Sequence, residues 1–445
     1  MKTAIKTATP ESPARVPNAL RLADATTALS RVLTFTYPAD AVLGRYFRER
    51  HVLGQQDRGF VAEAVFGVLR RKELFDHVAP QATPRQLVLL WLARIAGFSS
   101  RELTPLCKGD EIQWLNATRA QSTALPLNVE ADLPQWIVER MLEQHDDDFI
   151  RNLGRALQDP APLDLRVNTI RSNRDTVLAA LIASGIEAVA MPFSPIGIRV
   201  KGKPSINRHP LFTSGAIEVQ DEGSQVLGYL LAPRRTDLVV DFCAGAGGKT
   251  LMLGALMHSQ GRIYAFDVSQ KRLDNLKPRL KRSGLSNLHP LVIAHENDTK
   301  VKRLAGKIDR VLVDAPCSGL GTLRRNPDLK YRQSPQSVAE LMVKQAAILT
   351  AAARLVKPGG RLVYATCSLL AEENQDIIRA FLDAHPEFKS LNCGELLRRQ
   401  DINLDVGEQL QLWTHIHNTD GFFAAVMERT TGTHSGLNPA YSTRS

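Results

Sequence analysis

Apolar residues in the first third of the chain recur at helical spacing. Val61, Val65 and Val68 share one face of a helix, and the stretch PRQLVLLWLARIAG is apolar enough to form a buried helix. No alternation typical of strands interrupts this region. We therefore predict an all-helical domain over residues 23–150. Residues 1–22 carry lysines but no apolar run typical of a secretory signal, so we expect a disordered arm there.

The next region, residues 151–232, combines short strands with one helix. The predicted order is a strand at Leu163–Val167, a helix at Asp175–Ala183, and strands near Ile186–Ala190 and Gly197–Val200. This βαββ order indicates a small α+β module.

Beyond this module the pattern becomes an alternation of strands and helices. LVVDFCA, GRIYAFDVS, LHPLVIA, IDRVLVDAP and GRLVYATCS are five apolar, β-branched runs separated by helical segments, and GFFAAVMER is a further strand candidate. Such an alternation predicts an α/β fold, a Rossmann-like and mostly parallel sheet, over residues 233–430. Residues 431–445 are polar and predict a disordered tail.

Composition narrows the functional classes. The 445 residues are 44% hydrophobic and 23% charged, and the net charge of +10 favours a polyanionic partner such as nucleic acid. The five cysteines are scattered and include no C-x-x-C pair, which argues against a disulfide framework or a zinc site and favours a reducing cytoplasm. No apolar run reaches transmembrane length. We expect a cytoplasmic protein with no metal and no membrane partner, for which a monomer suffices.

The stretch DFCAGAGGKT ends like a phosphate-binding loop but does not match one. Cys243 stands where that loop requires glycine, and Thr250 stands at the third glycine position of a dinucleotide fingerprint. A glycine-rich turn between a strand and a helix still lets a ligand approach the backbone closely.

Two acids downstream indicate what this ligand is. Asp267 ends the next strand, at the spacing of an acid that binds a ribose, and Asp298 follows the third strand, where it could meet an adenine amino group. The set fits an adenosine without phosphates, as in S-adenosylmethionine. The alternatives are that Asp267 only caps a helix and that Asp298 is an ordinary loop acid.

Two cysteines also lie at predicted strand ends. Asp314 and Cys317 follow the fourth strand and Cys367 follows the fifth, so both thiols should face the crevice at the carboxyl ends of the strands. Methylation of a pyrimidine at carbon 5 needs such a pair. One thiolate adds to carbon 6, which activates carbon 5, and the enzyme is afterwards released with the help of a base.

Several of these motifs resemble those of a known protein family. DFCAGAGGKT, DAPCSGLGTLRRNPDLK, YATCSLLAEENQ and TDGFFAAVMER resemble the Nop/Sun family of RNA cytosine-5 methyltransferases, and the match covers roughly Leu163 to Arg429. The segment DRGFVAEAVFGVLRRKELFD resembles the NusB-like RNA-binding domain of the family's bacterial small-subunit rRNA members.

The resemblance implies a role for each matching residue. Cys367 would be the nucleophile and Cys317 would assist product release, while Asp314 and Lys249 would contact the reacting groups. The loop departs from the family's Cys-Ala-Ala-Pro-Gly-Gly-Lys at Gly245 and Ala246, and we expect cofactor binding to survive this change. The implied S-adenosylmethionine-binding residues are Cys243, Ala244, Gly245, Ala246, Gly247, Gly248, Lys249, Asp267, Asp298 and Asp314.

Basic residues near these motifs are candidates for contact with RNA phosphates. Arg166 and Arg171 lie in the α+β module, and Arg324, Arg325 and Lys330 directly follow the Cys317 motif. A solvated basic face is the alternative for the arginines of the module.

The motifs together with this resemblance therefore predict an S-adenosylmethionine-dependent RNA cytosine-5 methyltransferase, and the resemblance implies small-subunit rRNA as its substrate. The same chemistry on tRNA or large-subunit rRNA is the alternative within this class. A non-catalytic RNA-binding assembly factor and a phosphate-loop ATPase are alternatives from other classes; the two thiols argue against the first and Cys243 against the second.

Overall fold

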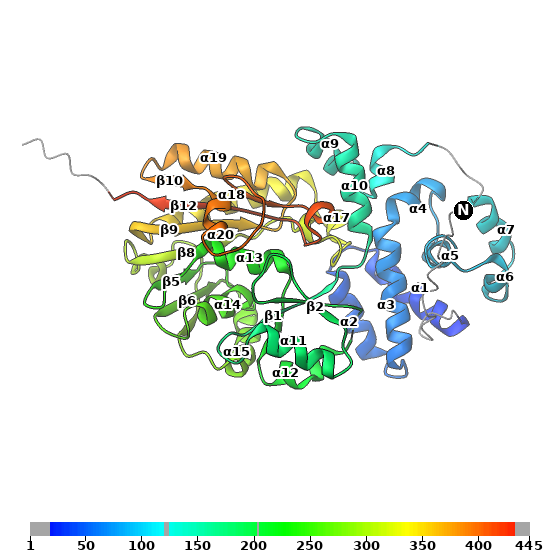
Figure 1. The fold of residues 1–445 in the computed structure, drawn as a ribbon. Helices are drawn as coiled ribbons and strands as arrows, with labels where there is room; N and C mark the ends of the chain where they lie inside the picture. The colour runs from blue at the N-terminus through cyan, green and yellow to red at the C-terminus, as the bar shows by residue number, and fades with distance from the viewer. Residues whose placement is uncertain (1–17, 120–123, 203, 432–445) are drawn as a thin grey trace, which may run out of the picture. The chain divides into compact units, whose positions relative to one another are not determined.

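The computed structural model describes residues 18–119, 124–202 and 204–431 (Figure 1). Residues 1–17 of the predicted arm and residues 432–445 of the predicted tail lie outside this range. The chain forms two compact units. One combines Met1–Ala161 with Thr322–Ser337 and Thr414–Asn418, and the other contains Pro162–Gly321, Val338–Trp413 and Thr419–Ser445.

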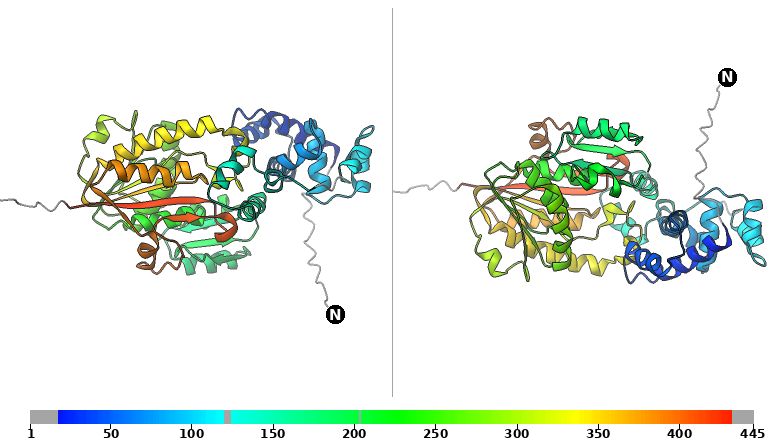
Figure 2. Two further views of the ribbon diagram at one scale, coloured as in Figure 1. Left: turned by 90° about the horizontal axis from the view of Figure 1, so that it is seen from above. Right: turned by 90° about the horizontal axis from the view of Figure 1, so that it is seen from below.

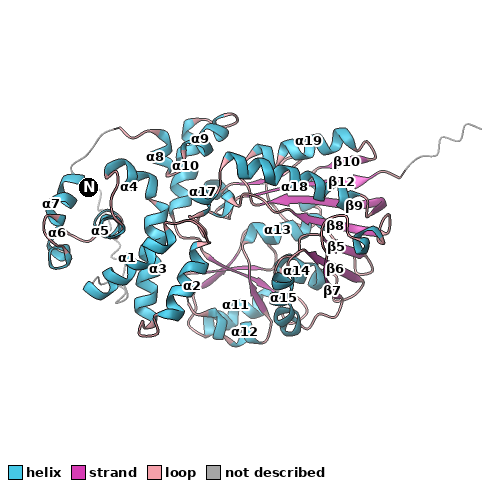
Figure 3. Ribbon diagram, turned by 180° about the vertical axis from the view of Figure 1, so that it is seen from behind, coloured by secondary structure: helices cyan, strands magenta, loops and turns pink. Residues whose placement is uncertain are grey.

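The first unit is helical throughout its described part (Figure 3). Its core helix α5 begins at Thr83, whose side chain caps the backbone N–H of Gln86 and is followed by Pro84, as expected at a helix start. Leu89, Leu90 and Leu92 of this helix are fully buried because other helices surround it. The helices of this unit are α1 (Ala19–Val32), α2 (Ala39–Glu49), α3 (Gln55–Arg70), α4 (Lys72–Val78), α5 (Pro84–Arg94), α6 (Ser100–Leu103), η2 (Thr104–Leu106), α7 (Glu111–Arg119), α8 (Leu127–Ala131), α9 (Gln135–Leu142), α10 (Asp147–Gln158), α17 (Leu329–Arg332) and α21 (Thr414–His417).

The boundaries of this unit differ from the predicted ones. Helix α1 already begins at Ala19, because Asn18 accepts the backbone N–H of Arg21 at 2.8 Å and caps the helix. Helix α10 extends to Gln158, beyond the predicted boundary at residue 150. The helical part is therefore longer at both ends than the apolar pattern predicts.

Two segments that the sequence places in the methyltransferase domain belong instead to the helical unit. These are Thr322–Ser337 and Thr414–Asn418. In the first, the Asp328 carboxylate accepts the backbone N–H of Ala39 at 3.1 Å, a donor that has no partner within its own helix at the start of α2. Contacts between residues so distant in sequence leave no trace in local periodicity.

The second unit begins with a small antiparallel sheet in the order β2-β3-β1-β4. The predicted strands β1 and β3 have the predicted bounds, and β2 and the helix are close to theirs. The three-residue strand β4, within GAIEVQ, was not predicted. The elements are β1 (Leu163–Val167), α11 (Arg174–Ala183), β2 (Ala188–Ala190), β3 (Gly197–Val200), η3 (Ile206–Arg208), α12 (Pro210–Thr213) and β4 (Ile217–Val219).

The larger sheet has the order β10-β12-β9-β8-β5-β6-β7, with β11 paired to β12. Strands β5 to β9 are parallel, as predicted, and β12 runs antiparallel between β9 and β10. The short strands β10 and β11 were not predicted. The strands are β5 (Leu238–Asp241), β6 (Arg262–Asp267), β7 (Leu288–Val292), β8 (Ile308–Asp314), β9 (Val356–Thr366), β10 (Phe388–Leu391), β11 (Leu410–Leu412) and β12 (Phe422–Arg429).

Helices cover both faces of this sheet (Figure 2). One apolar cluster joins the sheet to α13, α14, α15 and α20, and a second joins its other face to α16, α18 and α19. Because β5 pairs with both β6 and β8, the strand order reverses beside β5, and a ligand crevice is expected at the carboxyl ends there. The helical elements are α13 (Glu222–Leu231), α14 (Gly248–Leu256), α15 (Gln270–Ser283), α16 (Thr299–Lys302), η4 (Leu320–Thr322), α18 (Pro335–Ala353), η5 (Ala371–Glu373), α19 (Gln375–Ala384) and α20 (Cys393–Arg398).

Candidate active site

The glycine-rich loop lies between the end of β5 and the start of α14. Gly245 and Gly247 have positive φ angles of 57° and 79°. A Cβ atom on Gly247 would lie 2.1 Å from Leu276 Cδ1, whereas one on Gly245 would meet nothing within 4 Å. The backbone is therefore tightly packed on one side and open at Gly245, where a ligand can approach it.

Asp267 ties this loop to the next strand. One carboxylate oxygen accepts the backbone N–H of Gly245 at 2.9 Å, and the other accepts the N–H of Ser269 at 2.7 Å. Asp267, the residue predicted to bind the ribose, therefore lies beside the glycine loop. It also organises the start of α15, so the capping alternative and the binding role are compatible.

Arg166 reaches the same loop from the α+β module. Its side chain is 2% exposed, and its guanidinium donates to the carbonyl oxygen of Gly248 at 2.5 Å and to the Gln220 side chain. Burial lowers the pKa of Arg166 to about 10. The expectation that Arg166 meets an RNA phosphate is not supported, because its charge is used inside the protein to hold the start of α14.

A partly buried ion pair lies at the end of the loop. Lys249 Nζ lies 2.6 Å from Asp314 Oδ2, and the ammonium is 5.5 Å from the centre of the Phe422 ring. Burial opposes the charge of Lys249, but the charge and hydrogen bond of Asp314 outweigh it and raise the pKa of the lysine. The nearby carboxyl of Asp241 has a pKa raised to about 7 by burial, although the Thr250 hydroxyl donates to it at 2.7 Å.

The two predicted thiols lie side by side. Cys317 follows β8 and Cys367 follows β9, two neighbouring parallel strands, and their sulfur atoms are 3.5 Å apart. Both side chains are partly exposed. The hydrogen bond with Cys367 and burial raise the pKa of Cys317 well above its ordinary value, so Cys317 holds its proton at neutral pH. The sequence predicted this meeting from the strand ends alone.

Glu373 is a buried residue at this site that the sequence reading missed. Its carboxylate accepts from the backbone N–H of Ser318, from the Ser368 hydroxyl and from the Gln345 amide, at 2.8, 2.5 and 2.9 Å. Ser318 and Ser368 directly follow the two thiols, so one carboxylate joins both thiol loops. The only sequence trace of this role is an acid pair in the AEEN segment after the Cys367 motif.

Two predicted cofactor residues have other contacts in the structure. Asp298 caps α16 and accepts the backbone N–H groups of Ala294 and Lys300, each at 2.8 Å, so its contact with an adenine stays a prediction. Burial, together with the charge of Asp241, raises the pKa of Cys243 well above its ordinary value, which fits a packing role in the loop.

The predicted RNA-binding residues after the Cys317 motif are largely turned inward. Arg324 and Lys330 are 3% and 4% exposed, so these two side chains are not available to phosphates in this conformation. Arg325 is half-buried. Arg171 is exposed and donates to the carbonyl oxygen of Ser283 at 3.2 Å, at the end of α15, so a phosphate contact for it stays a prediction.

Comparison with known proteins identifies the family. The family model described as 16S rRNA methyltransferase RsmB/F matches residues 228–428, and that of its ferredoxin-like domain matches residues 133–207. A Synechocystis protein named probable ribosomal RNA small subunit methyltransferase B is 32% identical over 419 residues, which cover 86% of this chain and 93% of that protein. The chain belongs to the RsmB/F family of 16S rRNA methyltransferases. A Bacillus subtilis protein of the same name is 29% identical over 85% of this chain and 92% of its own length.

Two solved structures are similar to this chain in fold. The crystal structure of the protein PH0851 matches with a TM-score of 0.76 and 27% identity, covering 93% of this chain and 99% of that one. A methyltransferase homolog protein from Pyrococcus horikoshii matches with a TM-score of 0.54 and 27% identity, over 67% of this chain and 100% of its own. The predicted Rossmann-like fold is confirmed.

RsmB/F proteins are S-adenosylmethionine-dependent methyltransferases, and the residues present fit this cofactor. The open backbone at Gly245 gives the cofactor access to the loop, and the Asp267 carboxylate beside it suits ribose hydroxyls. No helix in the described part of the chain is long and apolar enough to cross a membrane. Residues 18–119, 124–202 and 204–431 also contain no cluster of three His, Cys, Asp or Glu side chains that could hold a metal ion.

Proposed function

We propose that this RsmB/F protein methylates carbon 5 of a cytosine in small-subunit rRNA through a covalent adduct with Cys367. The observation that carries the proposal is the 3.5 Å separation of the Cys317 and Cys367 sulfur atoms beside the Lys249–Asp314 pair. A protein that only binds RNA needs neither thiol. The small-subunit substrate is supported by the names of its relatives.

Cys367 is the nucleophile of this scheme. Its thiolate adds to carbon 6 of the cytosine, and the electron pair of the 5,6 double bond becomes available at carbon 5. S-adenosylmethionine, when bound, supplies the electrophilic methyl group that carbon 5 takes up. Asp314 is bonded to Lys249 through one oxygen, and its other oxygen can accept a hydrogen bond from the target base or from the methionine end of the cofactor.

Cys317 acts in the release step. Before the adduct forms, the hydrogen bond with Cys367, burial and the negative charge of the Cys367 thiolate raise the pKa of Cys317. Formation of the adduct converts Cys367 into a thioether and removes the charge of its thiolate, so one of the effects that keep Cys317 protonated is lost when a base is needed, while burial and Glu373 still act on it. Once Cys317 has given its own proton to solvent, its thiolate takes the proton from carbon 5, the double bond re-forms, and the bond between carbon 6 and Cys367 breaks to return the Cys367 thiolate.

A methylation map of RNA tests the proposal. Purified protein is given labelled S-adenosylmethionine and total RNA that lacks this modification, and 5-methylcytosine is located by bisulfite sequencing with Cys367→Ala as control. A single site in small-subunit rRNA that is lost in the variant is the expected result. Label in tRNA or large-subunit rRNA would overturn the substrate, and no label in any free RNA or in small-subunit particles would favour a non-catalytic RNA-binding factor.

A further inference from the structure

The chain changes units directly after the loop that carries Cys317. Pro162–Gly321 belongs to the second unit, which contains the larger sheet and is called the methyltransferase unit below, and Thr322–Ser337 belongs to the helical unit. Four residues therefore separate the proposed release thiol from a segment held by a different core, and a constraint on that segment acts on the loop through the backbone.

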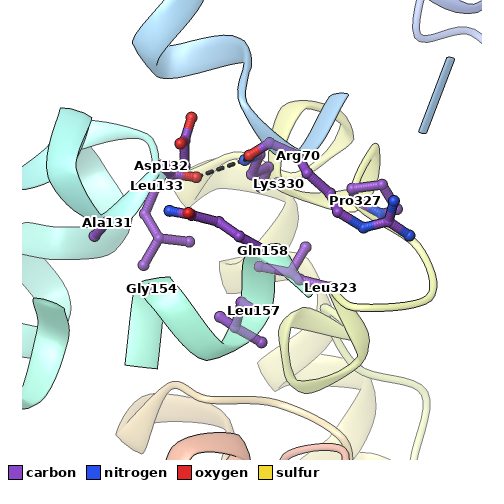
Figure 4. A pocket seen from close by; sticks show the side chains of 10 residues that line it. All are labelled: Arg70, Ala131, Asp132, Leu133, Gly154, Leu157, Gln158, Leu323, Pro327 and Lys330. Atoms are coloured by element: carbon purple, nitrogen blue, oxygen red, sulfur yellow. Dashed lines mark hydrogen bonds between the residues drawn. The ribbon is translucent and has the colours of Figure 1, made fainter. Parts of the chain in front are cut away.

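Lys330 anchors this segment inside the helical unit. Its ammonium donates to the carbonyl oxygen of Asp132 at 2.5 Å and to that of Arg70 at 3.2 Å, beside a cavity that Leu157 and Leu323 also line (Figure 4). Burial lowers the pKa of Lys330 to about 8. Burying an ammonium group is unfavourable unless its N–H donors find hydrogen-bond acceptors. Carbonyl groups of two other segments supply these acceptors, so Lys330 fixes its own segment to them.

The chain passes from one unit to the other again after Asn418, and hydrogen bonds join this stretch to the one around Gly321. In the helical unit, Arg324 donates to the Asn418 side chain at 3.2 Å. In the methyltransferase unit, the N–H of Gly421 donates to the carbonyl oxygen of Gly321 at 2.8 Å, and the N–H of Gly321 donates to that of Cys367 at 2.8 Å. A Cβ atom on Gly321 would lie 2.2 Å from Gly421 O, so the two backbones pack directly against each other here.

We propose that Lys330 is a positioning residue for Cys317: by anchoring the segment after Gly321 in the helical unit, it holds the release thiol against the adduct. The inference rests on the proposed roles of the two cysteines. It assigns the helical unit a part in completing the reaction, in addition to any part in choosing the RNA. Loosening the anchor should affect release of the product more than attack by Cys367, because Cys317 lies on the same stretch of chain as the anchored segment, whereas the Cys367 loop meets that stretch at Gly321 through a hydrogen bond to the Cys367 carbonyl oxygen.

The test compares Lys330→Met with Lys389→Met in the full-length protein. Lys389 is an exposed lysine of the edge strand β10 that pairs with Glu428, and its loss should change little. Each variant receives S-adenosylmethionine and the RNA fraction that accepts the methyl group. Methyl transfer in a single turnover, the covalent protein–RNA adduct, and turnover are then measured. Lys330→Met should transfer the methyl group at a rate within about twofold of wild type, accumulate adduct, and turn over roughly 10- to 100-fold more slowly, since small displacements of a reacting group have effects of this size.

A parallel measurement on Cys317→Ala distinguishes the positioning role of Lys330 from the release role of Cys317 itself. If Cys317→Ala accumulates adduct and Lys330→Met does not, the positioning role is wrong and the proposed function stands. If Cys317→Ala accumulates no adduct, the assignment of the release thiol itself is wrong. Should Lys330→Met fail to fold, Arg324→Gln, which cuts the link to Asn418, takes its place, and normal turnover in that variant would overturn the inference.

Discussion

The Glu373 carboxylate accepts the backbone N–H of Ser318 at 2.8 Å, one residue beyond Cys317. It also accepts the hydroxyl of Ser368, one residue beyond Cys367. A single buried acid therefore sets the spacing of two loops that lie 50 residues apart in the chain. Glu373 also contributes to the raised pKa of Cys317, after the hydrogen bond with Cys367, burial and the charge of Cys367.

Glu373→Gln should lower both stability and activity. The amide has one acceptor oxygen where the carboxylate offers two, so at least one donor loses its partner, at a cost of about 1–3 kcal/mol in the free energy of unfolding. Urea unfolding measures this cost, and a methylation assay measures the loss of activity. Glu372→Gln, at the partly exposed neighbouring position, is the control. Equal effects of the two changes would argue against the bridging role.

The two cysteine variants should differ in kind. Cys367→Ala removes the nucleophile, and we expect neither methyl transfer nor a covalent complex. Cys317→Ala retains the attacking thiol but lacks the release thiol, so a protein–RNA adduct should accumulate and be visible on a denaturing gel. An adduct in Cys367→Ala and none in Cys317→Ala would reverse the two roles.

Asp267→Ala should weaken cofactor binding. The change removes the acceptor for the Gly245 N–H and the proposed ribose ligand, and loss of hydrogen bonds to a charged group lowers affinity roughly 10- to 100-fold. Calorimetric titration with S-adenosylhomocysteine measures this. Asp274→Ala, an exposed acid on α15, should bind as the wild type does. Unchanged affinity in Asp267→Ala would remove Asp267 from the cofactor site.

Substitution of Arg166 should affect cofactor binding, whereas substitution of Arg171 should affect RNA binding. Arg166→Met removes the buried contacts to Gly248 and Gln220 and should weaken cofactor binding, while affinity for RNA at saturating S-adenosylhomocysteine stays the same. Arg171→Met changes an exposed side chain and should weaken RNA binding with a smaller salt dependence. If Arg166→Met lowered RNA affinity alone, the original phosphate-contact prediction for this residue would be restored.

Asp241 should make stability depend on pH. Its pKa rises from 3.8 in the unfolded chain to about 7 in the folded protein, so the folded state binds the proton more tightly. Its contribution to stability is full below about pH 4 and is lost as the pH rises to about 7, by about 4 kcal/mol at most. Urea unfolding of wild type and Asp241→Asn between pH 4 and 8 tests this. The difference in unfolding free energy between the two should vary across that window, and a constant difference would contradict the assignment.

The sequence by itself determined the parallel sheet and the place of the thiols within it. Strands β5 to β9 lie in apolar, β-branched runs, and the carboxyl ends of parallel strands must share one edge, so the sequence pattern alone places the glycine loop, Asp267, Asp314, Cys317 and Cys367 at that edge. These features depend on local periodicity and on one rule of topology.

Only the tertiary structure decided which charged residues face inward. Arg166, Arg324 and Lys330 look like surface cations in the sequence, yet each is buried, with hydrogen-bond acceptors far away in the chain. The bridging role of Glu373 and the transfer of Thr322–Ser337 to the helical unit have the same origin. Partners separated by tens to hundreds of residues leave no periodic pattern, because burial of a charge is settled by what packs around it.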